Sequence, residues 1–165
     1  MRPIMDKILI VSDTHRRNEN YLDIVKKCGP FQKVIHCGDV EGSEFTIAEA
    51  AGCPVEMVMG NNDFFSDLPR EKEFMLGKYK VWLTHGHNYY VSMDNQTIKK
   101  EARAKGVDIV MYGHSHRPVV DYDKEIIAVN PGSLTYPRQE GRKPSYIIME
   151  IDSMGEAHFT IHYVD

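Results

Sequence analysis

The chain has 165 residues, a length typical of one compact domain, and its 42% hydrophobic and 27% charged residues are an ordinary globular composition. Twenty basic and 24 acidic residues give a formal net charge of −4, which argues against nonspecific binding to duplex nucleic acid. The same balance is compatible with a small phosphorylated substrate, because a metal ion can supply positive charge locally.

The cysteine content indicates whether disulfides form, and the hydropathy indicates the compartment. Cys28, Cys37 and Cys53 are odd in number and form no CxxC pair, so we expect reduced thiols in or near the core. The apolar run at residues 8–11 is too short for a signal peptide, and no stretch approaches the roughly 20 apolar residues of a membrane span. We therefore expect a single domain, residues 1–165, in the cytoplasm and without membrane association.

The first 60 residues alternate strand and helix patterns. Short apolar runs predict buried strands at residues 7–12, 33–37 and 54–59. Helical patterns lie between them at residues 19–27 and 42–51, and Gly29-Pro30 and Gly52 stop these helices. This order predicts parallel strands joined by crossover helices.

The second half is richer in strands. Residues 73–76 and 79–84 flank Gly77-Lys78 as a hairpin, and residues 94–105 form a helix with Asp94 as its candidate cap and Gly106 at its end. Further strands are predicted at residues 107–112, 126–129, 146–151 and 158–163. The predicted class is α/β, with two packed sheets and outer helices in three or four layers.

Polar clusters follow five of the predicted strands at the point where each should end. Ligands of open α/β sheets bind beyond the carboxyl ends of the strands, so we expect these clusters to converge on one edge. The clusters are Asp13-Thr14-His15, Gly38-Asp39, Gly60-Asn61-Asn62-Asp63, Thr84-His85-Gly86 and Gly113-His114-Ser115-His116.

The residue types in these clusters point to metal binding. Carboxylate, imidazole and amide oxygen are ligands of first-row divalent metals. Asp13 and His15 are two residues apart, so both side chains would face the same side of an extended segment, and the same holds for His114 and His116. Each cluster alone is weak evidence, but their joint occurrence at strand ends predicts a centre for two metal ions.

The ordered set of motifs resembles the signature of the calcineurin-like metallophosphoesterase superfamily. The compact length, Thr84-His85-Gly86-His87, and Asn130-Pro131-Gly132-Ser133 followed by Pro137-Arg138 resemble its small bacterial and archaeal phosphodiesterase branch, the YfcE-like proteins. This branch is also similar to a eukaryotic retromer scaffold subunit. The resemblance implies a four-layer αββα sandwich of two mixed sheets flanked by helices.

The resemblance also implies two divalent metal ions per chain and their ligands. Asp13, His15, Asp39 and His116 would hold one ion, and Asp39, Asn61, His85 and His114 the other, with Asp39 bridging. Mn²⁺ is the expected ion, and Ni²⁺, Fe²⁺, Co²⁺ or Zn²⁺ would also suit these ligands. Asp63 would orient a neighbour at the edge of the metal site.

Asn62 departs from the commonest pattern of the superfamily. Larger members have a histidine here that is thought to protonate the leaving group, whereas an amide can donate a hydrogen bond but cannot deliver a proton. The identity of any general acid therefore stays open. Substrates whose leaving group needs no proton, such as aryl phosphodiesters, should react best.

Five residues outside the signature carry open readings. Arg16 and Arg17 form either a solvated loop pair or a contact to substrate phosphate. His87 is either a neighbour of the metal ligands or a residue that faces substrate. His36 is expected to pack beside the site, and Ser133 lies in a predicted turn that could reach it.

The function predicted is hydrolysis of small phosphodiesters by a hydroxide that bridges two metal ions, with Asp39, Asn61, Asn62 and Asp63 at the reaction centre. A protein-binding scaffold with little or no catalysis is one alternative, and all seven competent ligand positions count against it. A nuclease is the other, and the absence of a basic excess and of capping segments counts against it. A homo-oligomer is compatible with the sequence.

Overall fold

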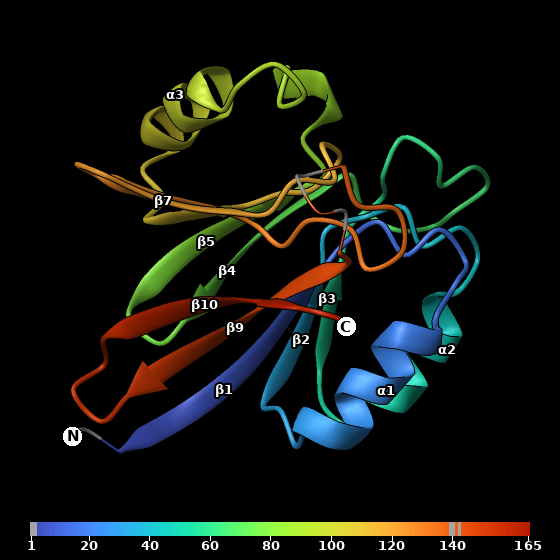
Figure 1. Cartoon of the computed structure of the whole chain (residues 1–165). Coiled ribbons are helices and arrows are strands. Elements are labelled where there is room, and N and C mark those ends of the chain that lie inside the picture. Colours follow the sequence, from blue (N-terminus) through green and yellow to red (C-terminus); the bar gives the residue numbers. More distant parts are fainter. Residues whose placement is uncertain (1–2, 139–140, 142) are drawn as a thin grey trace.

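The computed structural model describes residues 3–138, 141 and 143–165, and it has two five-stranded sheets packed face to face (Figure 1). Helices α1 (Glu19–Cys28) and α2 (Glu44–Ala51) cover the outer face of one sheet. Helix α3 (Gln96–Lys105) covers the outer face of the other. The predicted four-layer αββα sandwich is confirmed.

Both sheets are mixed. In the first sheet β1, β2 and β3 are parallel, and β9 is antiparallel to both of its neighbours, β1 and β10. The strand order is β10 (Ala157–Tyr163), β9 (Ser145–Asp152), β1 (Ile4–Val11), β2 (Lys33–His36) and β3 (Val55–Met57). In the second sheet the three central strands are parallel; its order is β4 (Glu71–Leu76), β5 (Tyr79–Thr84), β6 (Ile109–Met111), β8 (Ile126–Asn130) and β7 (Val119–Asp123).

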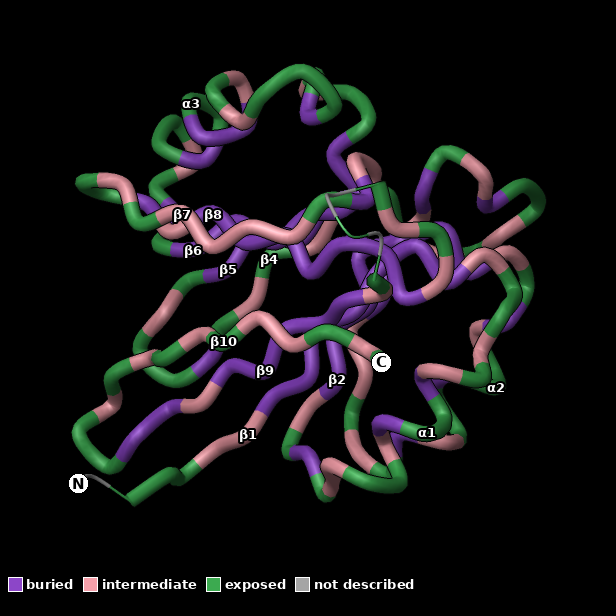
Figure 2. Tube along the Cα trace, in the orientation of Figure 1, coloured by how far each residue is buried: buried purple, intermediate pink, exposed green. Residues whose placement is uncertain are grey.

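The unbroken apolar run of β1 is explained by burial on both faces. Ile8 and Ile10 point into the layer between the two sheets, whereas Leu9 and Val11 point to the helices α1 and α2. Because successive side chains of a strand alternate between faces, a strand covered on both sides must be apolar throughout. Figure 2 shows the buried segments concentrated in the strands, with exposed residues on the outer helices.

The structure corrects several predicted boundaries. Strand β1 begins at Ile4 because its first half pairs with β9, and α2 begins at Glu44. Helix α3 begins at Gln96 with Asn95 in the capping position, while Asp94 accepts the backbone N–H of Gln96 from outside the helix. Strand β7 was not predicted, because it lies at a sheet edge with mostly half-buried side chains.

The predicted hairpin and helix ends are confirmed. The Gly77-Lys78 hairpin joins antiparallel β4 and β5, and Gly52 and Gly106 end their helices in the left-handed region, with φ of 66° and 71°. All three cysteines are free thiols. Among residues 3–138, 141 and 143–165, no helix has the length and apolar character required to cross a membrane. A short 3₁₀ helix η1 (His87–Tyr89) follows β5 and borders the site described next.

Candidate metal centre

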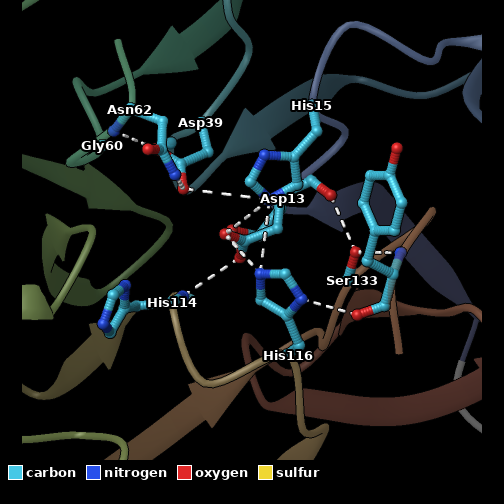
Figure 3. A network of polar contacts seen from close by, with 12 residues as sticks. Asp13, His15, Asp39, Gly60, Asn62, His114, His116 and Ser133 are labelled. Atoms are coloured by element: carbon cyan, nitrogen blue, oxygen red, sulfur yellow. Dashed lines mark hydrogen bonds and ion pairs between the residues drawn. The ribbon is translucent and has the colours of Figure 1, made fainter. Parts of the chain in front are cut away.

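The polar clusters converge on one edge of the two sheets, as predicted from their positions after strands. The backbone N–H of Asp13 donates to the Gly38 carbonyl (3.0 Å) and that of His15 to the Asp39 carbonyl (2.9 Å), which joins the loops after β1 and β2. The N–H of Gly113 donates to the His85 carbonyl (3.0 Å), which joins the loops after β5 and β6. Figure 3 shows the side chains gathered around Asp13.

Five of the predicted ligands form a tight cluster. The Oδ1 atom of Asp13 lies 3.3 Å from Nε2 of His116 and 3.7 Å from Nε2 of both His15 and His85. The Oδ2 atom of Asp39 lies 3.3 Å from Nε2 of His85 and 3.9 Å from Nε2 of His15. Two three-residue groups could each hold a metal ion: Asp13, His15 and His116, and Asp13, Asp39 and His85. Asp13 belongs to both groups, and Asp39 belongs to the second.

The loops that carry these ligands are not extended. Asp13, His15, His114 and His116 all have positive φ, between 47° and 70°, a region that residues other than glycine rarely adopt. The expectation of extended segments is therefore wrong, although Asp13 and His15 do converge on one group of side chains. His114 contacts Asn61, whereas His116 contacts Asp13, so the tight turns point the two histidines at different neighbours. Such strained backbone is concentrated at functional sites.

Two buried atoms at the centre of the cluster have no hydrogen-bond partner in the described chain: Oδ1 of Asp13 and Nε2 of His85. The other oxygen of Asp13 accepts from the Ser12 hydroxyl (2.6 Å) and from the backbone N–H of His114 (3.0 Å). Unpaired buried polar atoms are costly and rare in folded proteins. Divalent cations bound in this cluster would satisfy both atoms, so the residues present fit a metal centre.

Three imidazoles are oriented by partners on their Nδ1 side. When Nδ1–H donates outward, the Nε2 lone pair is left facing the cluster, which is the arrangement typical of metal-ligating histidines. The Nδ1 partners are the Cys37 carbonyl for His85 (2.8 Å), the Tyr136 carbonyl for His116 (2.5 Å) and the Glu41 carboxylate for His15 (3.1 Å).

The electrostatics of the cluster favour a cation. Burial alone would raise the pKa of Asp13, but the charges of His85 and His116 hold it well below its usual value. Burial of His85 likewise opposes its protonation, but the charges of the Asp13 and Asp39 carboxylates outweigh it and raise its pKa to about 9. The two buried carboxylates therefore stabilise the protonated form of His85 when no metal ion lies between them.

Asp39 is held by the loop after β3. The backbone N–H of Asn62 donates to its Oδ1 (2.8 Å) and the Asn62 amide to its Oδ2 (3.1 Å). Asp63 accepts the N–H groups of Asp39 (2.8 Å), Gly60 (2.7 Å) and Glu41 (2.7 Å), which places it where it can orient Asp39. A Cβ on Gly60 would lie 2.2 Å from Oδ1 of Asp39, so only glycine permits this approach.

Asn61 and His114 lie at the margin of the cluster. Oδ1 of Asn61 is 3.1 Å from Nδ1 of His114, whose ring centroid is 5.2 Å from that of His85, and His114 belongs to neither three-residue group. His87 is exposed, with its ring 5.5 Å from that of His85 and 6.0 Å from that of His114. A hollow of about 250 Å³ is lined by Asn61, His87, Phe64 and Arg70.

Several contacts of the site were not predicted. Glu41 follows Asp39 by two residues, and its charge was the one available signal in the sequence for its contact with His15. The contacts of the Cys37 and Tyr136 carbonyls could not be predicted from the sequence, because every residue has a backbone carbonyl. Ser133, which was considered as a neighbour, donates to the Asp13 carbonyl (2.7 Å).

The remaining candidates are placed as follows. His36 is buried, with Nε2 3.0 Å from the Thr14 hydroxyl and Nδ1 accepting the N–H of Gly38 (3.0 Å), so it packs beside the site as expected. Arg16 donates to the Glu41 carbonyl (3.0 Å), and the guanidinium of Arg17 lies 5.5 Å from the centroid of the Tyr136 ring.

Comparison with known proteins agrees with this geometry. The sequence profile of the calcineurin-like phosphoesterase superfamily domain matches residues 6–154. A probable metallophosphoesterase of Bacillus subtilis, YsnB, is 32% identical over 147 residues, covering 88% of this chain and 85% of the relative. The phosphodiesterase MJ0936 of Methanocaldococcus jannaschii is 30% identical over 145 residues, covering 76% and 82%.

A solved structure shares the fold. Vps29 of Entamoeba histolytica, complexed with zinc, superposes with a TM-score of 0.76 over 95% of this chain and 98% of its own, at 24% identity. With the profile match spanning most of the sequence, the chain belongs to the calcineurin-like phosphoesterase superfamily.

Proposed function

We propose that this protein is a phosphodiesterase that depends on two divalent metal ions and hydrolyses small phosphodiesters. The observation that carries the proposal is the pair of buried, unpartnered atoms, Oδ1 of Asp13 and Nε2 of His85, 3.7 Å apart among ionised carboxylates. Neither atom has a hydrogen-bond partner in the described chain, and metal coordination would satisfy both.

The proposed ligand sets are those that the family resemblance implies, and they extend the two three-residue groups with Asn61 and His114. Asp13, His15, Asp39 and His116 would hold one ion, and Asp39, Asn61, His85 and His114 would hold the other. Asp39 is proposed as the bridge because its Oδ2 lies between His85 (3.3 Å) and His15 (3.9 Å), one histidine from each set. Mn²⁺ is the ion we propose first, since mixed oxygen and imidazole ligands suit it.

When bound, the two cations would lower the pKa of water and offset the charge of the phosphoryl oxygens. The chain's own residues would fix the geometry. Glu41 orients His15, the Cys37 carbonyl orients His85, and Asn62 anchors Asp39. Because Asn62 cannot deliver a proton, substrates whose leaving group departs as a stable anion, such as aryl esters, should react best.

A diester is favoured over a monoester by the space around the cluster. One hollow borders His15 and His116, and the other borders Asn61 and His87. A diester has an arm on each side of phosphorus, and the two hollows can accept one arm each. The relative from Methanocaldococcus jannaschii is likewise named a phosphodiesterase.

A second candidate function is a protein-binding scaffold, which the similarity to Vps29 supports. The unpartnered Asp13 and His85 atoms count against it, because a scaffold has no need to retain a costly polar cluster. A nuclease that acts on polymers is disfavoured by the net charge of −4.

The test is a screen of purified protein with Mn²⁺, Ni²⁺, Fe²⁺, Co²⁺, Zn²⁺ and Mg²⁺ against bis(4-nitrophenyl) phosphate and 4-nitrophenyl phosphate. We expect metal-dependent turnover with the diester preferred, and a loss of more than about a hundredfold in Asp39→Asn, since the ions supply several kcal/mol of charge stabilisation. Lack of turnover with every ion, or full activity of folded Asp39→Asn, would refute the enzyme.

A further inference from the structure

A hollow of about 860 Å³ opens beside the candidate metal centre, on the side of His15 and His116. Its lining adds Arg117, Arg138 and the ring of Tyr136 to these two histidines. This volume is in the range that accommodates a whole small ligand, and it exceeds what one phosphoryl group requires. The hollow therefore has room for a part of the substrate that extends beyond the reacting phosphate.

The wall of this hollow is tied to the backbone that carries the candidate ligands. The backbone N–H of Arg138 donates to the His116 carbonyl (3.1 Å), and the Tyr136 carbonyl accepts from His116 Nδ1 (2.5 Å). The N–H of Tyr136 donates to the Ser133 hydroxyl (2.7 Å), which in turn donates to the Asp13 carbonyl. In Figure 3, Ser133 lies on one side of Asp13, and His114 and Gly60 lie on the other. The hollow thus has a fixed position relative to the centre.

The described lining of the hollow carries positive charge. None of its described lining residues is a carboxylate. Arg117 and Arg138 are exposed, and within the described chain neither guanidinium forms an ion pair or hydrogen bond. By contrast, Arg103 on α3 is paired with Asp123 at 2.6 Å. The guanidinium of Arg17 lies 5.5 Å from the centroid of the Tyr136 ring but does not line the hollow.

We propose that this hollow is a subsite for a second phosphoryl group, so that the substrate is a phosphodiester with a pendant phosphomonoester on one arm. The proposal rests on the proposed diesterase function. The planar guanidinium groups of Arg117 and Arg138 match the geometry of phosphate oxygens and can each donate two hydrogen bonds to them. A dianionic group on the arm is the partner that these two arginines, which are unpaired within the described chain, would select.

The test uses a matched pair of chromogenic esters. Thymidine 5′-(4-nitrophenyl phosphate) and its 3′-phosphorylated counterpart share the scissile bond and the leaving group, and differ in the pendant phosphate alone. We expect the wild-type protein with Mn²⁺ to prefer the 3′-phosphorylated ester in kcat/KM by about tenfold or more, the effect of one or two charge-assisted hydrogen bonds. This preference should fall as ionic strength rises.

The double variant Arg117→Ala/Arg138→Ala should lose the preference, and Arg138→Gln alone should reduce it. Lys100→Ala/Lys124→Ala removes two exposed positive charges elsewhere on the surface and should keep the preference. Circular dichroism and Mn²⁺ titration establish that each variant is folded and binds metal.

Equal use of the two esters by the wild-type protein, or a preference that survives in the double variant, would overturn the subsite. If neither ester is hydrolysed, the diesterase function fails, and calorimetry still decides on the subsite. Thymidine 3′,5′-bisphosphate must then bind more tightly than thymidine 5′-monophosphate, and the double variant must remove the difference. Equal affinity for the two nucleotides would contradict the proposal independently of activity.

Discussion

Asn62 donates two hydrogen bonds to the carboxylate of Asp39, one from its backbone and one from its side chain. The backbone N–H donates to Oδ1 of Asp39 at 2.8 Å and the amide Nδ2 donates to Oδ2 at 3.1 Å. The residue that replaces the histidine of larger superfamily members therefore contacts the carboxylate proposed to bridge the two ions. A side chain at position 62 lies close enough to the candidate centre to influence both the carboxylate and a bound substrate.

Asn62→His should raise the turnover of diesters with poor leaving groups more than that of diesters with good ones. A well-placed general acid is typically worth about 10²–10⁴-fold, and a leaving group that departs as a stable anion gains little from it. The measurement compares kcat for ethyl phenyl phosphate and ethyl 4-nitrophenyl phosphate at one pH with Mn²⁺. Asn62→Ala serves as the control that removes the amide without adding a proton donor. An equal gain for both esters would argue against a role of this position in protonation.

Glu41→Ala should weaken Mn²⁺ binding by about 10–100-fold, because Glu41 accepts from Nδ1 of His15 (3.1 Å) and so keeps Nε2 facing the cluster. Glu41→Gln should retain most of the affinity, since its amide oxygen also accepts Nδ1–H. Glu49→Ala, which removes an exposed carboxylate on α2, is the control for net charge. Calorimetry gives the affinities, and ¹⁵N NMR of His15 gives the tautomer. A wild-type Mn²⁺ affinity in Glu41→Ala would show that Glu41 is not needed to orient His15 for metal binding.

Metal binding should release a proton from His85. In the metal-free protein Asp13 and Asp39 raise the pKa of this imidazole to about 9 despite its burial, so it is protonated at neutral pH. A cation can bind Nε2 only after that proton leaves, so apparent affinity should rise with pH up to about pH 9, by roughly tenfold per unit. Calorimetry at pH 7.5 in buffers of different ionisation enthalpy counts the protons. An apparent metal affinity that does not change between pH 7 and pH 9 would contradict the release of a proton from His85.

The position of the site could be predicted from the sequence because it depends on topology. Asp13, Asp39, His85 and His116 each follow a strand that runs parallel to its neighbour, and parallel strands present their carboxyl ends at one edge. The paths of the loops could not be predicted in this way. The positive φ of Asp13 arises where tight turns and cross-loop hydrogen bonds override the local preference of the residue.

The contacts that orient the candidate ligands could not be predicted from the sequence, for a related reason. The Tyr136 carbonyl orients His116 although the two residues are 20 positions apart, and a backbone carbonyl is present at every residue. Strand β7 escaped prediction because an edge strand with two aspartates and half-buried side chains lacks the apolar pattern of the central strands. Contacts made by backbone atoms require the folded chain to be known.

The most direct test of the dinuclear centre is a crystal structure of the protein grown with Mn²⁺, with anomalous diffraction data collected at the manganese edge. We predict two anomalous peaks about 3.5–4 Å apart, the spacing of two-metal hydrolytic sites. Asp39 should lie between them, with His15 and His116 on one ion and His85 and His114 on the other. A single peak at saturating Mn²⁺, or two peaks that share no carboxylate, would contradict the account.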